Sequence, residues 1–142
     1  MSYCIHMRIP AVVLVPGEIA GARLPVTLAY KPEDPLAVAL TFTLRFGGDR
    51  EWVTCRTVAR DLLSDGLETL SGTGDVTAWT GINLRDRYYL KVRSGTRSAI
   101  LSLETSWVEG FLAKTYRSIP AGTELQAVDL GAELNAILRD AV

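Results

Sequence analysis

Two cysteines and a single histidine are the residues of this 142-residue sequence best suited to nucleophilic or metal chemistry. Cys4 and His6 share one face of an expected first strand, about 7 Å apart. A zinc site needs about four ligands, and Cys55 is the only other soft ligand in the chain. A Cys–His nucleophilic pair is conceivable but lacks an evident orienting group. We therefore expect no catalytic residue, no metal and no cofactor, and a partly covered sheet face at these positions.

A glycine pair in Gly72-Thr73-Gly74-Asp75 is the next candidate, because glycine-rich loops cradle phosphates. Thr77 stands where the third glycine of a dinucleotide fingerprint would be, and no Lys-Ser/Thr pair ends the motif. A strand is expected after the glycines, whereas phosphate loops lead into a helix. The pair therefore predicts a simple turn. The sixteen carboxylates show no spacing that selects a pair for acid–base work.

A basic row in the segment 85–97 is the strongest feature left unexplained. Strand parity turns Tyr88, Leu90 and Val92 inward and projects a second set outward, namely Arg87, Tyr89, Lys91 and Arg93, with Arg97 across the turn. A basic row with an aromatic residue is typical of sheets that bind single-stranded nucleic acid. An acidic protein partner fits the same row, and so does a solvated sheet face. One short row is smaller than the basic patch of a typical nucleic-acid-binding protein, so nucleic acid is the less favoured partner.

Composition excludes several classes of protein. The net charge of −1 gives no overall field that would attract nucleic acid or anionic membranes. The N-terminus does not resemble a signal peptide, and no run approaches the roughly 20 apolar residues of a spanning helix. Two cysteines without an export signal indicate reduced thiols. We expect one cytoplasmic domain covering residues 1–142.

The elements that would position these residues are mostly strands with period-two alternation. Strands are expected at 3–9, 24–30, 36–46, near 51–57, and then near 74–79, 86–93 and 98–103. Between these groups Val58, Leu62 and Leu63 predict a short helix over 58–64, ended by a left-handed cap at Gly66.

Two helices are expected at the C-terminal end, one within 104–117 and one starting at an N-cap at Asp129. The fold class is therefore α+β, with about seven to eight strands in two antiparallel sheets, a short mid-chain helix and two C-terminal helices.

Four segments resemble, in order, the SsgA-like family of sporulation and cell division regulators of actinobacteria. They are DPLAVALTFTL, VARDLLSDGL, GTGDVTAW and AGTELQAVDLGAELNAIL, and the resemblance spans roughly residues 24 to 139. It is strongest to the family member that marks septum sites and positions the division ring. The segment Thr54–Val58 departs from the family pattern and leaves the register of the fourth strand open.

The resemblance implies a regulator without catalytic residues or small-molecule substrate. Its partners would be the tubulin-like division protein FtsZ and another SsgA-like paralogue, and it would concentrate at division septa. It also implies a homotrimer and a Whirly-like fold. In this setting Asp61 is favoured by the dipole of the short helix, while Arg60 spans to a neighbouring carboxylate or carbonyl and Leu62 and Leu63 anchor the helix.

Overall fold

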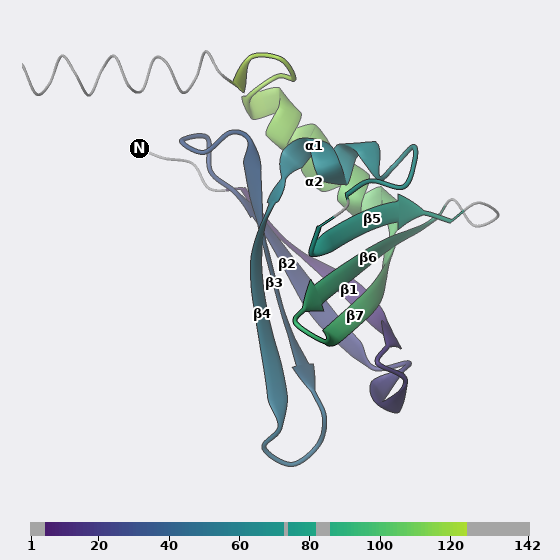
Figure 1. Cartoon of the computed structure of the whole chain (residues 1–142). Coiled ribbons are helices and arrows are strands. Elements are labelled where there is room, and N and C mark those ends of the chain that lie inside the picture. Colours follow the sequence, from purple (N-terminus) through teal and green to yellow (C-terminus); the bar gives the residue numbers. More distant parts are fainter. Residues whose placement is uncertain (1–4, 73, 82–85, 125–142) are drawn as a thin grey trace, which may run out of the picture.

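The computed structural model describes residues 5–72, 74–81 and 86–124, which form seven strands, two α-helices and one 3-10 turn (Figure 1). In chain order they are β1 (Ile5–Val15), η1 (Gly17–Ile19), β2 (Arg23–Tyr30), β3 (Ala37–Arg45), β4 (Glu51–Ala59), α1 (Arg60–Asp65), β5 (Val76–Thr80), β6 (Arg87–Ser94), β7 (Arg97–Glu104) and α2 (Thr105–Ser118). The α+β class is confirmed.

The strands form one curled antiparallel sheet of order β4-β3-β2-β1-β7-β6-β5, where the sequence predicted two sheets. The joint is β1, which runs to Val15 instead of ending near residue 9. It pairs with β2 from Ile5 to Val12 and with β7 from Ala11 to Val15, so the two ladders overlap at Ala11 and Val12. Pro10 does not stop the strand, because it lies opposite Pro25 at one level of the ladder and before the pairing with β7 begins.

The core lies on the inner side of the curl, where alternate residues of the strands meet the two helices (Figure 1). β3 shows this most clearly, because Val38, Leu40, Phe42 and Leu44 are buried while their neighbours are partly exposed. This is the burial expected of a sheet with one covered face. From α2 the core receives Val108, Phe111 and Leu112.

The chain around α1 differs from the expectation in two details. β4 continues through Val58 to Ala59, in unbroken register with β3, so Val58 is a strand residue and the helix begins at Arg60. Gly66 has φ −62° and ψ −17°, a right-handed conformation and not the predicted left-handed cap. Space explains the glycine, because a Cβ there would lie 2.8 Å from the Ala78 Cβ and 2.9 Å from the Tyr88 hydroxyl.

The C-terminal helix α2 is confirmed over Thr105–Ser118. The second predicted helix, from Asp129, lies outside the described residues, as does Cys4.

Candidate functional site

The predicted basic row lies on the outer face of β6, with the orientation that strand parity indicates. Tyr88, Leu90 and Val92 are buried, while Lys91 and Arg93 between them are exposed. Arg97 begins β7 opposite Ser94 and is also exposed. The three exposed cations Lys91, Arg93 and Arg97 are hereafter the hairpin face.

The two other predicted members of the row are half-buried and engaged with neighbouring strands. Arg87 donates from Nε to the Ser102 hydroxyl at 2.8 Å. Tyr89 stacks on Trp79 of β5, with ring centroids 5.6 Å apart, so part of the ring surface that a base would need is occupied. The hairpin is therefore a cationic surface whose aromatic member already has a stacking partner.

The glycine pair is a turn, as predicted. Gly72 has φ +97°, Ser71 pairs with Ala78, and β5 follows directly. A Cβ at Gly72 would collide with the Val76 carbonyl oxygen, so this position requires glycine for both conformation and space. Thr73 lies outside the described residues.

The soft ligands of the described chain are not brought together. His6 on β1 and Cys55 on β4 are both exposed, and β2 and β3 lie between their strands. Within residues 5–72, 74–81 and 86–124, no three His, Cys, Asp or Glu side chains are grouped so as to hold a metal ion.

The most enclosed charged group in the described residues is Arg60, which is only 1% exposed. Its Nη1 donates to the carbonyls of Thr115 at 3.2 Å and Ile119 at 2.7 Å, and its Nη2 donates to Glu124 Oε1 at 2.7 Å. The guanidinium also lies over the rings of Tyr116, at 4.1 Å, and Tyr30, at 5.2 Å. The prediction that Arg60 spans to a carboxylate or a carbonyl is confirmed, and it contacts both.

These contacts indicate that the cluster around Arg60 stabilises the fold. Two carbonyls at the end of α2 accept from the guanidinium, that of Thr115 in addition to the Ile119 N–H at 2.9 Å, and two aromatic faces cover the cation. Burial raises the pKa of the Tyr30 and Tyr116 hydroxyls despite the nearby cation. The arrangement ties α1 and β2 to the end of α2, and its cation is closed to solvent.

The comparison with known families decides the identity. The family described as Streptomyces sporulation and cell division protein, SsgA, matches residues 24–124. This chain belongs to the SsgA family. Two relatives are named sporulation-specific cell division protein SsgB. That of Frankia casuarinae is 38% identical over 88% of this chain and 85% of its own length, and that of Streptomyces coelicolor is 34% identical over 96% and 93%.

Two solved structures of the SsgA family share the fold. A structure from work on SsgB mutations that correlate to longitudinal cell division during sporulation of Streptomyces coelicolor superposes with a TM-score of 0.75 at 29% identity, over 89% of this chain and 97% of that one. The SsgA-like sporulation-specific cell division protein of Thermobifida fusca gives 0.79 at 26% identity, over 95% and 96%. Among the described residues of this SsgA-family chain, no helix is long and apolar enough to span a membrane.

Glu124 makes the stability of this SsgA-family chain depend on pH. Hydrogen bonds from its own backbone N–H and from Arg60 favour the carboxylate and hold its pKa below the ordinary value. A lowered pKa stabilises the fold above the unfolded-state pKa, and this stabilisation is lost as the pH falls through the folded-state value. We expect Glu124→Gln to lower the urea midpoint at pH 7 by more than at a pH below the folded-state pKa of Glu124, where both proteins carry a neutral group. A difference that is constant with pH would contradict the carboxylate's role.

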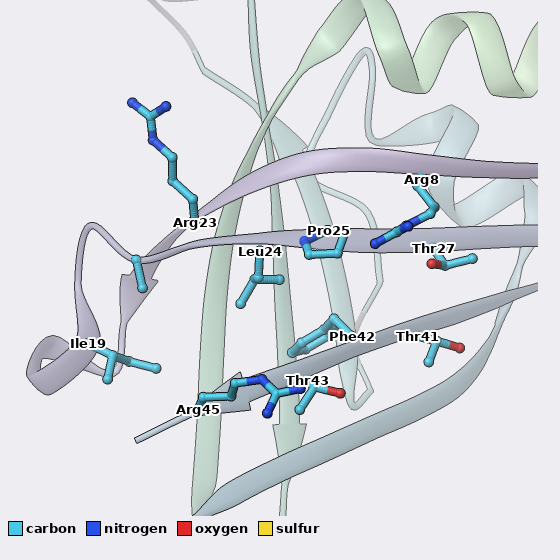
Figure 2. Close-up of a pocket in the computed structure, with 11 residues that line it drawn as sticks. Arg8, Ile19, Arg23, Leu24, Pro25, Thr27, Thr41, Phe42, Thr43 and Arg45 are labelled. Atoms are coloured by element: carbon cyan, nitrogen blue, oxygen red, sulfur yellow. The ribbon is translucent and has the colours of Figure 1, made fainter. Parts of the chain in front are cut away.

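Sequence reasoning missed a groove on the outer face of β2 and β3. It has a volume of about 510 Å³ and is lined by Arg8, Arg23 and Arg45, with Thr41, Thr43 and Pro25 among the other residues. Figure 2 shows Leu24 and Phe42 pointing toward each other across the gap between the two strands. Strand parity predicts that Arg23 and Arg45 point outward. No sequence pattern, however, indicates where two neighbouring strands move apart, so the groove itself could not be predicted.

Proposed function

We propose that this chain is a non-enzymatic regulator of sporulation-specific cell division that marks septum sites and recruits FtsZ. The observation that carries the proposal is family membership across most of the chain, together with relatives named sporulation-specific cell division proteins over 85% or more of their own length. The mechanism is binding alone, with the protein located in the cytoplasm and concentrated at septa.

We further propose that the protein acts as a homotrimer. FtsZ forms a polymer with repeated sites, so an oligomer that engages several subunits gains avidity without any new contact. A symmetric ring of three copies also presents the same face three times. A second SsgA-like paralogue is proposed as an additional partner at the septum.

The hairpin face is the proposed contact for an acidic surface of FtsZ. Lys91, Arg93 and Arg97 are exposed and lie on two strands whose inner residues are buried, so the charges sit on a rigid support. Rim charges of this kind mainly raise the association rate and set specificity. Arg87 and Tyr89 support the face through Ser102 and Trp79.

Co-sedimentation with polymerised FtsZ tests the proposal. We expect the parent chain to pellet in proportion to polymer, and Lys91→Glu/Arg93→Glu to reduce the pelleted fraction about fivefold or more, because two attractive pairs become repulsive. The matched control is Lys114→Glu/Arg117→Glu, which makes the same charge change on exposed residues of α2. A parent chain that stays in the supernatant with the polymer would refute direct recruitment.

Titration of a labelled single-stranded oligonucleotide at low salt separates this proposal from the nucleic-acid interpretation of residues 85–97. The proposal expects no binding. Binding that weakens steeply as salt increases would instead indicate phosphate contacts by the basic row.

A further inference from the structure

The strands β2 and β3 pair over only part of their length. Their register covers Thr27 with Thr41, Leu28 with Leu40 and Ala29 with Ala39. Both strands continue beyond these pairs, β2 back to Arg23 and β3 on to Arg45. The arginine-lined groove occupies the space between these continuations (Figure 2).

Pro25 accounts for the end of the ladder. Val13 donates its N–H to the Ala22 carbonyl at 2.9 Å and accepts from the Gly21 N–H at 2.8 Å, so its backbone groups face β2. The N–H and C=O groups of successive residues point to opposite sides of a strand. Those of Ala11 therefore also point toward β2, and those of its partner Leu24 point toward β1. The backbone nitrogen and carbonyl of Pro25 therefore point toward β3. If the β2–β3 register continued, Pro25 would pair with Thr43. Because proline has no N–H, the Thr43 carbonyl finds no donor there.

The opposite side of the groove is an open strand edge on β3. Phe46 donates to the Arg50 carbonyl of the β3–β4 turn at 3.0 Å, so even-numbered residues at this end of β3 face β4. The N–H and C=O groups of Thr43 and Arg45 then point into the groove, beyond the last residue that pairs with β2. An open edge of this kind accepts an added strand.

The positive charge of the groove favours an added strand with acidic side chains. Three arginines, Arg8, Arg23 and Arg45, are among its lining residues, and none of those residues is Asp or Glu. Arg45 contacts Glu51 at 3.4 Å, but the two side chains are 79% and 46% exposed, so the pair is weak. A neighbouring hollow of about 640 Å³ shares Arg8 and Arg23 and extends the surface to Arg87, Trp107 and one carboxylate, that of Glu104.

We propose that the groove binds an extended acidic segment of a partner protein, added as a strand along β3. Alternate side chains of the segment point outward, where carboxylates meet Arg8, Arg23 and Arg45. The intervening side chains point inward and contact Leu24 and Phe42. The segment therefore alternates acidic and apolar residues. The proposal holds whichever protein supplies the segment, and it is independent of FtsZ recruitment.

The test titrates the ¹⁵N-labelled full chain with a capped octapeptide of alternating Glu and Val, followed by NMR. We expect the amide signals of Thr43 and Arg45 to shift and their hydrogen exchange to slow about tenfold at saturation, because both N–H groups gain an acceptor. Arg8→Glu/Arg23→Glu is expected to weaken binding about tenfold or more, whereas Lys91→Glu/Arg93→Glu, with the same charge change on the hairpin face, is expected to leave it unchanged.

Two further peptides separate strand addition from simple charge attraction. A Lys–Val octapeptide is expected not to bind. The Glu–Val peptide methylated on alternate backbone nitrogens keeps its charge but loses the donors of one edge, and it is expected to bind about tenfold more weakly. The proposal is overturned if Thr43 and Arg45 do not respond, or if the methylated peptide binds equally. It is also overturned if the two amides are already protected at high concentration of the chain alone, which would assign the edge to a second copy.

Discussion

Replacing Arg60 by alanine should lower the free energy of unfolding by about 3–5 kcal/mol, as expected when one member of a buried ion pair is removed. The change deletes the donors to Thr115, Ile119 and Glu124 and empties the space between the rings of Tyr30 and Tyr116. The Thr115 carbonyl keeps the Ile119 N–H as a donor, whereas the buried Glu124 carboxylate loses its charged partner, which carries a penalty of its own.

Urea unfolding followed by circular dichroism measures this loss. Asp61→Ala is the matched control, because Asp61 is the next residue on α1 but is exposed and accepts one long hydrogen bond, from the Tyr116 hydroxyl at 3.4 Å. It should cost less than about 1 kcal/mol. Arg60→Lys should fall between the two, since one ammonium cannot reproduce the fork that meets three acceptors. An Arg60→Ala protein as stable as the Asp61 control would show that the cluster around Arg60 does not tie the helices together.

Gly66→Ala should destabilise the fold by about 2–3 kcal/mol, the range expected for overpacking a well-filled core. The new methyl group would lie 2.8 Å from the Ala78 Cβ and 2.9 Å from the Tyr88 hydroxyl. That hydroxyl cannot move freely, because it donates to the Leu63 carbonyl at 2.7 Å. The backbone at Gly66 is right-handed and suits alanine, so the whole effect comes from space.

A second substitution makes this prediction specific. Ala78→Gly removes one of the two colliding groups. The double variant Gly66→Ala/Ala78→Gly should therefore lose about 1 kcal/mol less free energy of unfolding than the two single variants lose in sum. Thermal unfolding of the four proteins gives the coupling. Strict additivity, or a Gly66→Ala protein with the parent's midpoint, would contradict the close packing of α1 on β5.

Local pattern predicted most of the strands because each has one buried and one exposed face. Of the six alternating apolar residues of 36–46, the middle four lie in β3 and point inward, whereas Leu36 lies before the strand and is exposed and Phe46 follows it. The alternation of 86–93 became β6 with the predicted side inward. The joining of the two halves was not predictable in this way. It depends on the pairing of β1 with β7, between residues far apart in the chain, and on the tolerance of Pro10 beside Pro25.

For the candidate surfaces too, features set by strand parity were predictable, and features that depend on the arrangement of several strands were not. Parity placed Lys91 and Arg93 on the outside without any knowledge of the sheet order. The arginine-lined groove needs three neighbouring strands and a ladder that ends at Pro25, so Arg8, Arg23 and Arg45 show no common spacing. The contacts of Arg60 were predicted in kind, but its burial depends on Tyr30 and Tyr116, which flank it only in the folded chain.

Family membership was first indicated by four ordered segments and is shown by the match over residues 24–124. Residue types alone indicated a binding protein and made nucleic acid the less favoured partner, but they named no particular protein, because a cationic strand face attracts any acidic surface. The proposed division role therefore depends on the relatives, and the hairpin face is the surface proposed for it.

Dissociation of FtsZ from the immobilised chain tests the central claim, multivalent recruitment of a division polymer, most directly. Biolayer interferometry would compare FtsZ polymerised with GTP and FtsZ kept monomeric without nucleotide. The account predicts dissociation from polymer at least about tenfold slower than from monomer, because several copies engage one filament. Equal dissociation rates, or no binding of either form, would contradict it.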